Sequence, residues 1–322
     1  MTQSIAFEEV PYWSEGVDCA ADLFLPEGTG PHPGIVLGHG WNQTKQGLRT
    51  EASRVRDAGF VVMLIDYRTL GNSGGSPRGQ IFPRNQVEDL RNAITFLRRR
   101  PDVDPDRVGI YGVSFAGGLA LHAAAFDRRI KVCVAQSPIV SGRRWMREIR
   151  NSYGYDQLLL KLQRNFEERY ERGPDAQTMV LYPAAGALDP PGADTPPAAR
   201  AAYDIMPRWD PDNPNSCAFP DKCQESFNPL IDLESIRHVI DFNPMDTIEM
   251  IAPRPLLIVA NAGGVYDWIH TPEAVQEAFA KAGEPKELAF LPHDAFGFYQ
   301  EPGRSEVMAI VLPFLKKHLK GA

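Results

Sequence analysis

A serine flanked by small residues is the first candidate for chemistry in this chain. Ser114 lies in the stretch VGIYGVSFAGG, with Gly112 before it and Ala116 and Gly117 after it. Small side chains on both sides allow a sharp turn from a strand into a helix, and such a turn exposes the hydroxyl. The following residues, FAGGLALHAAAF, have helical composition, so free N–H groups and the positive end of the helix dipole would face an oxyanion there. We predict that Ser114 is a nucleophile.

A serine hydroxyl is a poor nucleophile until an imidazole takes its proton, and a carboxylate must then orient that imidazole. The chain contains seven histidines and 41 acidic residues, so composition alone does not select the partners. Which of them can reach Ser114 depends on the elements that carry them.

The order of apolar and helical segments predicts a parallel sheet with helices on both faces. Residues 5 to 25 alternate in polarity around Ser-Glu-Gly, which indicates an antiparallel hairpin at the sheet edge. The apolar runs GIVLGHG, FVVMLIDY and RVGIYGV are separated by segments 46 to 58 and 83 to 100, which have helical spacing. Strand and helix alternate in this way in a doubly wound, mostly parallel sheet of the α/β class.

The alternation continues after the serine helix and stops between residues 141 and 241. IKVCVAQSP supplies another strand before the interruption. After it follow a predicted helix MDTIEMIA, the strand PLLIVAN, the helix TPEAVQEAFAKAG, the strand KELAFLP and a last helix from Ser305 to Leu319. We expect residues 1–140 and 242–322 to form the core domain and 141–241 to be a mostly helical lid insertion.

Within the insertion, helical spacing from Arg143 to Arg172 is interrupted near Gly154, and proline-rich and irregular stretches follow. Aromatic side chains at helical spacing favour the core of the lid over the lining of an acyl or aryl pocket. These are Trp145, Tyr153, Tyr155, Phe166, Tyr170 and Trp209. Arginines at 143, 144, 147 and 150 fit a solvated helix face or a site for a carboxylate or phosphate equally well.

Taken together, the element order and the motif Gly112-Val113-Ser114-Phe115-Ala116 resemble the nucleophile elbow and overall plan of the α/β-hydrolase superfamily. The usual motif has glycine where this chain has Ala116. The resemblance covers nearly the whole chain except the insertion, and it points to lidded serine esterases and to X-prolyl-peptidase-like and dienelactone-hydrolase-like members. In that family the acid follows a late strand and the histidine follows the final strand, which implies a triad of Ser114, Asp267 and His293.

The histidine has rivals that the sequence places less favourably. His39 also follows a strand, His122 lies inside the serine helix, and His270 starts the next helix. His32, His238 and His318 lie in a loop, the insertion and the tail.

The acid is the least secure member of the triad. Asp246 fits a helix cap, Glu273 lies in a first helical turn, and Asp294 adjoins the histidine. Asp267 also arrives later after its strand than the short turn usual in the family.

Two further segments resemble parts of the same family. HGW at His39 to Trp41 resembles its oxyanion loop, which implies that the amides of Trp41 and Phe115 are the oxyanion-hole donors. The stretch IDYRTLGNSGG resembles the Asp-x-Arg-x-x-Gly-x-Ser segment of esterases and peptidase-like hydrolases. We expect its Asp66 and Arg68 to fix a loop beside the pocket, and Ser73 to have no nucleophilic role.

Composition excludes several function classes. A net charge of −7 and a pI near 5.6, with no basic stripe, argue against nucleic acid as a partner. No segment predicts a signal peptide or a membrane span, so we expect a cytoplasmic protein that does not enter a membrane. Cys19, Cys133, Cys217 and Cys223 are too few for a disulfide scaffold, and no histidine pair completes a zinc site beside Cys217 and Cys223. We expect neither a metal nor a cofactor.

The sequence therefore predicts a serine hydrolase that cleaves a carboxylic ester or thioester of a small-molecule acyl substrate through an acyl-enzyme on Ser114. Carbon–carbon bond hydrolysis and acyl transfer use the same triad and stay open, as does a homologue that binds a ligand without turnover. Substrate identity, oligomeric state, including a homo-oligomer, and pairing of Cys217 with Cys223 are left open as well.

Overall fold

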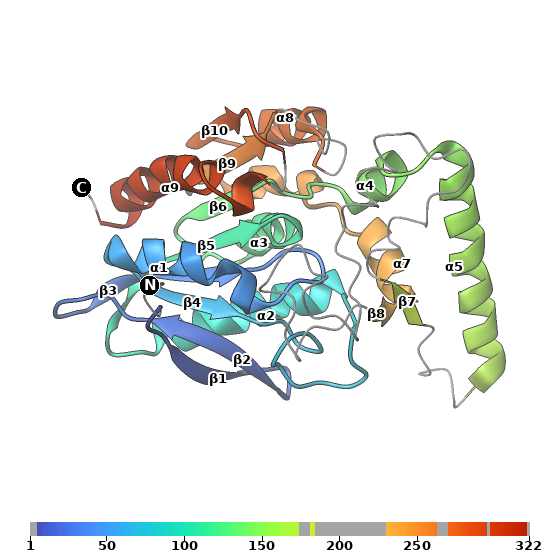
Figure 1. Ribbon diagram of the computed structural model, residues 1–322, viewed down its shortest axis with the longest axis horizontal. Coiled ribbons are helices and arrows are strands. Elements are labelled where there is room, and N and C mark those ends of the chain that lie inside the picture. The colour runs from blue at the N-terminus through green and yellow to red at the C-terminus, as the bar shows by residue number, and fades with distance from the viewer. Residues whose placement is uncertain (1–4, 174–180, 184–229, 263–269, 295–296, 321–322) are drawn as a thin grey trace.

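The computed structural model describes residues 5–173, 181–183, 230–262, 270–294 and 297–320. Its centre is an eight-stranded sheet with the order β1-β2-β4-β3-β5-β6-β9-β10 (Figure 1). The strands are β1 (Glu8–Ser14), β2 (Val17–Phe24), β3 (His32–Gly38), β4 (Val61–Ile65), β5 (Val103–Val113), β6 (Cys133–Gln136), β9 (Leu256–Asn261) and β10 (Lys286–Leu291). β1 and β2, and β2 and β4, pair antiparallel, whereas the other neighbours pair parallel. The predicted mostly parallel α/β sheet is confirmed.

The edge hairpin forms where the alternation predicts it. Ser14 pairs with Val17, so only two residues make the turn. Both of them, Glu15 and Gly16, have positive φ (48° and 80°), which is the backbone of the tight turns whose twist matches a right-twisted hairpin.

Helices cover both faces of the sheet, as the apolar strands require. Side chains of a strand point alternately to opposite faces, and β3 illustrates this: Ile35 and Leu37 pack with α1 (Arg49–Asp57) and α9 (Gly303–Leu319), while Val36 packs on the other side. That other face carries α2 (Pro83–Arg98), α3 (Phe115–Phe126) and α8 (Pro272–Lys281) (Figure 1). Burial of both faces explains why β4 and β9 are apolar without alternation.

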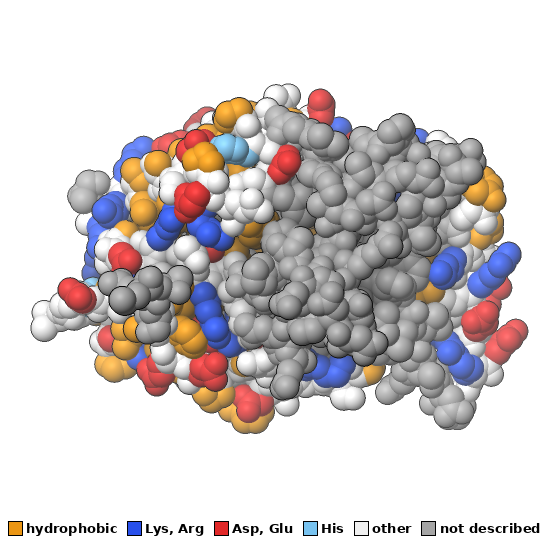
Figure 2. Space-filling model, in the orientation of Figure 1, with side chains coloured by type: hydrophobic (Ala, Val, Ile, Leu, Met, Phe, Trp, Pro, Cys, Tyr) orange, Lys and Arg blue, Asp and Glu red, His pale blue; other side chains and the backbone are white. Residues whose placement is uncertain are grey.

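The segment between β6 and β9 adds no strand to the main sheet within the described residues. It contains α4 (Gly142–Glu148), α5 (Ser152–Arg172), the paired strands β7 (Leu181–Pro183) and β8 (Leu230–Asp232), and α7 (Glu234–Ile240). In Figure 1, α5 lies far from the terminal helix α9, and in Figure 2 the surface at this end of the molecule carries hydrophobic, basic and acidic side chains. The boundaries of the lid, at 141 and 241, stay a prediction.

The predicted interruption of helical structure near Gly154 is confirmed, but it lies a few residues earlier in the chain. α4 ends at Glu148 and α5 begins at Ser152, so Gly154 lies within the first turn of α5. Asn151 is the N-cap of α5: its side chain accepts a hydrogen bond from the Gly154 amide at 2.7 Å. The glycine therefore lies inside the helix and does not end it.

The expectation that the lid aromatics form its core is also wrong for three of them. Tyr153, Phe166 and Tyr170 of α5 are 71 %, 62 % and 87 % exposed. The buried side of α5 is made instead by Leu158 and Leu162. Trp145 is buried, Tyr155 is partly buried against the core, and Trp209 lies outside the described residues.

The predicted helix MDTIEMIA is replaced by two 3-10 turns, Pro244–Asp246 and Ile248–Ile251. Thr247 separates them because its φ of −131° is not helical. The other predicted helices and strands of the core are confirmed, with α9 starting two residues earlier than expected.

Among the described residues, no helix combines the length and the apolar character needed to cross a bilayer.

Candidate active site

Ser114 stands at a strained turn between β5 and α3. Its φ of 58° and ψ of −121° are unusual for a residue with a side chain, and strain of this kind is typical of functional turns. A side chain at Gly112 would overlap the backbone carbonyl of Ala116, so the turn requires glycine there. Ser114 directly precedes the first turn of α3, and the positive end of the helix dipole there is suited to an anion.

The imidazole that reaches the serine is that of His270. The Oγ of Ser114 and the Nε2 of His270 are 2.8 Å apart. His270 lies just before α8, in the segment that follows β9, and the side-chain amide of Asn261 at the end of β9 donates to its carbonyl oxygen at 3.4 Å. β9 is two strands from β5 in the sheet, so its carboxyl end opens at the same edge as Ser114.

Burial decides the charge of this histidine. His270 is 7 % exposed, and desolvation lowers its pKa to about 3. The ring is therefore neutral near pH 7, and in the tautomer with hydrogen on Nδ1 its Nε2 can accept the proton of Ser114. Within the described residues, Nδ1 has no hydrogen-bond partner, so no carboxylate orients this ring there.

His293, the histidine that the family resemblance implies, has a different neighbour. It follows β10, and its Nε2 lies 2.8 Å from the Oε2 of Glu306 in α9. The nitrogen that would face the serine in a triad is thus occupied by a carboxylate. In this arrangement the expected pairing of Ser114 with His293 is replaced by the pairing with His270, and the catalytic role of His293 stays a prediction.

The contacts of the acidic residues bear on which of them could be the acid of a catalytic triad. Asp267 lies outside the described residues, so its predicted role stays a prediction. Asp294 accepts the amide of Gly297 at 2.7 Å, which is a local loop contact, and Glu273 lies in the first turn of α8. Asp246 belongs to a 3-10 turn and caps no helix with its side chain.

The loop after β3 lies against the serine. A side chain at Gly40 would come within 2.9 Å of the Cβ of Ser114, so only glycine permits this approach. The Gly40 amide donates to the side-chain oxygen of Gln43 at 3.0 Å, so this amide is already hydrogen-bonded within the loop. The assignment of the Trp41 and Phe115 amides as oxyanion donors stays a prediction. The aromatic rings of these two residues pack edge-to-face, with centroids 5.3 Å apart.

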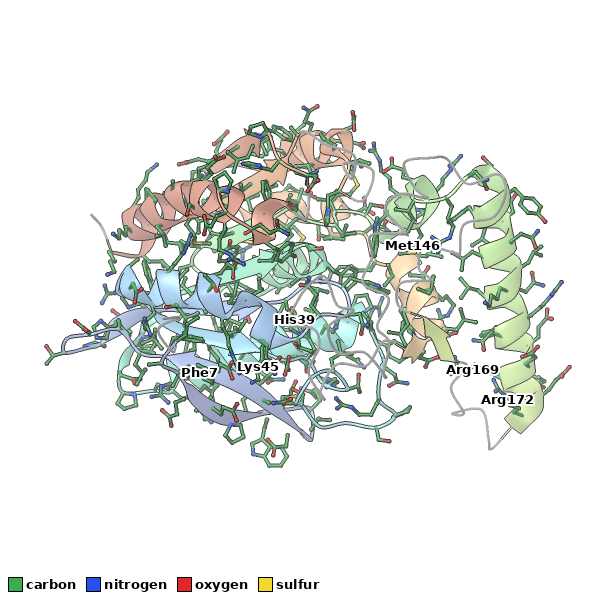
Figure 3. The ribbon with its side chains drawn as sticks, in the orientation of Figure 1. Phe7, His39, Lys45, Met146, Arg169 and Arg172 are labelled. Carbon is green, nitrogen blue, oxygen red and sulfur yellow. The ribbon has the colours of Figure 1, made fainter. Side chains whose placement is uncertain are left out.

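Asp66 fixes the loops after β3 and β4 by hydrogen bonds to backbone amides. It is fully buried and accepts the amides of Lys45 at 2.7 Å and Asn72 at 2.9 Å, and its Oδ1 lies 3.5 Å from the Nε2 of His39. His39 and Lys45 are labelled in Figure 3. Ser73 is also buried and donates to the carbonyl of Asp66 at 2.7 Å. These contacts support the loop-fixing role expected for Asp66 and leave Ser73 no exposed hydroxyl.

Arg68 has the structural role that was expected of it. Its Nε donates to Asp89 of α2 at 2.8 Å and its Nη2 donates to Ser14 of β1 at 2.9 Å. The network ties the loop after β4 to a helix and to the edge hairpin.

A pocket beside His270 is walled by the start of the insertion. Its lining is Pro138, Ile139, Val140, Ser141, Arg144, Trp145, Glu148, His270, Thr271 and Ala274. Arg144 at its rim is paired with Glu148 and, at 2.9 Å, with Glu277, and Glu148 also accepts the hydroxyl of Thr271 at 2.8 Å. The arginine charge is therefore compensated inside the protein, which disfavours a site for an anionic group.

Metal and thiol chemistry find no support in the described part of the chain. No group of three or more histidine, cysteine or acidic side chains there could hold an ion. Burial raises the pKa of the Cys19 and Cys133 thiols to about 12, so both are unreactive. Cys217 and Cys223 lie outside the described residues.

The parallel sheet, the elbow serine and the histidine supplied from beyond a late strand define an α/β hydrolase. A family model described as X-Pro dipeptidyl-peptidase (S15 family) matches residues 15–183, more than half of the chain, and the chain belongs to this family.

The chain is similar to named relatives over part of its length. The chain is 36 % identical over 136 residues to a thiohydrolase, aneE, of Aspergillus aculeatus, covering 42 % of each protein. It is 35 % identical over 136 residues to an acyltransferase, drtE, of Aspergillus calidoustus, covering 42 % of this chain and 44 % of that protein. The chain thus spans less than half the length of these curated relatives. The solved α/β hydrolase GrgF from a Penicillium species is similar in fold, with a TM-score of 0.77, 21 % identity, and coverage of 98 % of this chain and 99 % of that one.

His270 is the site residue that sequence reasoning set aside. It was assigned to a helix start, and it lies three residues after Asp267 in the same connection. The sequence did indicate that the connection after β9 begins at the same edge of the sheet as Ser114. It did not indicate which side chain of that connection faces the serine.

Proposed function

We propose that this protein hydrolyses a carboxylic ester or thioester through an acyl-enzyme on Ser114. The contact of 2.8 Å between the Ser114 hydroxyl and the neutral His270 imidazole carries the proposal, because a nucleophile and a base are already within hydrogen-bond reach. The neighbouring Gly40 loop and the start of α3 supply the region in which an oxyanion would be stabilised.

The reaction has two balanced halves. Ser114 attacks the acyl carbon as the imidazole takes its proton, and the tetrahedral intermediate then expels the alcohol or thiol, which receives that proton. Water next gives a proton to the imidazole and attacks the acyl-enzyme. The carboxylic acid leaves as Ser114 regains its proton.

Two histidines compete for the role of base. The contact with Ser114 supports His270, whereas His293 is supported by its position after the final strand, although its Nε2 is engaged by Glu306. We propose His270 as the base in the arrangement described here, with His293, oriented by Asp267, as the alternative that the family resemblance implies.

Labelling and turnover test the function. A fluorophosphonate probe should label the protein, and Ser114→Ala should abolish both labelling and hydrolysis of short acyl thioesters while the circular dichroism spectrum is unchanged. Labelling that persists on another residue would refute the assignment of Ser114.

The base is tested by parallel variants. His270→Gln should lower kcat by at least about 10²-fold, in line with the loss of general base catalysis, and His293→Gln by much less. The reverse ranking, together with a large loss in Asp267→Asn, would give the role to His293.

Acyl transfer is a second candidate because a relative of similar identity is an acyltransferase. In the second half-reaction, an acyl-enzyme can be attacked by water, by an alcohol or by an amine. Products formed with an added alcohol, separated by chromatography, would distinguish transfer from hydrolysis.

A further inference from the structure

An unpaired donor lies in the wall of the candidate site. Trp145 of α4 is 8 % exposed, and its indole Nε1–H has no hydrogen-bond acceptor among the described residues. A buried N–H without an acceptor is costly, so its retention in a binding wall points to a ligand that supplies one.

Its surroundings connect this indole to the reacting centre. Trp145 lines the same pocket as His270, whose ring contacts Ser114. The indole also packs edge-to-face on Trp41 at 5.4 Å and lies 6.1 Å from the ring of Phe115. Trp145 is therefore held by aromatic neighbours next to the serine turn.

The charges of the pocket indicate what kind of group the donor meets. Arg144, the one cationic side chain of the lining, is already paired with Glu148 and Glu277. A carboxylate or phosphate would have to displace these acids. A neutral acceptor, such as a carbonyl or hydroxyl oxygen, needs only the free N–H.

We propose that Trp145 is a specificity-determining residue whose indole N–H binds a neutral oxygen of the acyl group, beyond the carbonyl that reacts. The proposal rests on the function proposed above. It predicts a preference for oxygenated acyl groups over plain alkanoyl groups of equal length.

The test compares Trp145→Phe with the wild type on matched N-acetylcysteamine thioesters of hexanoic, 3-oxohexanoic and 5-oxohexanoic acids. Phenylalanine keeps an aromatic ring and removes the donor together with the second ring of the indole, so the hexanoyl thioester measures the effect of the lost packing alone. Loss of one hydrogen bond should lower kcat/KM about fivefold to tenfold for an oxo substrate, and less than twofold for the hexanoyl thioester. Trp13→Phe, at a side chain that is 71 % exposed on β1, is the control and should leave all three values unchanged.

Two outcomes would overturn the proposal. An equal loss on all three substrates would show that Trp145 acts through packing, and no loss on either oxo substrate would show that its N–H binds no acyl oxygen. Fluorophosphonate labelling of the wild type and of Trp145→Phe separates these results from failure of the proposed function. A wild type that is neither labelled nor active on any thioester would refute that function, whereas a labelled Trp145→Phe variant shows that its nucleophile is intact.

Discussion

At the scale of single residues, the site contains two groups whose burial or backbone conformation is energetically unfavourable. His270 is neutral because it is buried, and Ser114 is held at a backbone conformation that few residues with side chains adopt. Both costs are borne by the packing around them. Each therefore has a signature in stability measurements that is independent of any substrate.

The buried histidine should make stability depend on pH. The folded pKa of His270, about 3, lies below the value of about 6.5 for an unfolded chain, so the unfolded state binds one more proton between them. Stability from this group is therefore complete above about pH 6.5 and falls as the pH decreases, by up to about 1.4 kcal/mol per pH unit. Urea unfolding of His270→Gln should show a smaller decrease than the wild type between pH 6.5 and 4.5. Identical curves would mean that His270 is not buried in solution.

The serine turn should not tolerate a methyl group at Gly112. Gly112→Ala would force the new Cβ against the Ala116 carbonyl, so the turn must open or the protein must fail to fold. Fluorophosphonate labelling should be lost and soluble yield reduced. Gly47→Ala is the matched control, since nothing lies within 4 Å of its added Cβ, and it should label as the wild type does. Wild-type labelling of the Gly112 variant would contradict the described turn.

At the scale of elements, an ion pair attaches the helix α5 to α7. Glu234 of α7 is buried, and its Oε2 lies 3.2 Å from the Nη1 of Arg169 of α5; Arg169 is labelled in Figure 3. It also pairs with Arg237 on its own helix. The contact places a charge-assisted bond between two helices of the predicted lid.

Removing that charge should release α5 locally and leave the core intact. In Glu234→Gln, limited trypsin digestion should cut within α5 severalfold faster, because two arginines lose their carboxylate, while the midpoint of global unfolding changes little. Glu167→Gln, an exposed position on α5 that accepts only from Gln163 among its described contacts, is the control. Equal digestion of both variants would show that the pair does not anchor the helix.

At the scale of the whole molecule, buried charge ties distant parts of the chain together. Asp89 of α2 is fully buried and binds Arg68, from the loop after β4, and Ser14, from the edge hairpin. The hairpin, the sheet and a covering helix therefore share one network.

Asp89→Ala should lower the free energy of unfolding by about 3–5 kcal/mol, because it leaves the mostly buried Arg68 without its partner. Urea unfolding measures this directly, and labelling of Ser114 per folded molecule should not change, since the network does not contact the serine. Glu88→Ala, one residue away on the exposed side of α2, should cost less than about 1 kcal/mol. A similar small loss in both variants would mean that the network contributes little.

The amino-acid sequence by itself determined the features that rest on local constraints. Small residues around Ser114 permit one kind of turn, and continuous apolar runs between helical segments permit burial on both faces of a parallel sheet. The order of the elements and the turn at Ser114 follow from these patterns and agree with the structure. The loop-fixing role of Asp66 was expected from a resemblance to related hydrolases, and its contacts support it.

Only the tertiary structure decided which imidazole meets the serine and which aromatic side chains are buried. Ser114 and His270 are 156 residues apart in sequence, and their contact depends on the path of the connection between β9 and α8. In the same way, Trp145 is buried, and Tyr170 exposed, because of the faces that α4 and α5 turn toward the core. Helical spacing defines a face, but the neighbours that cover that face come from distant parts of the chain.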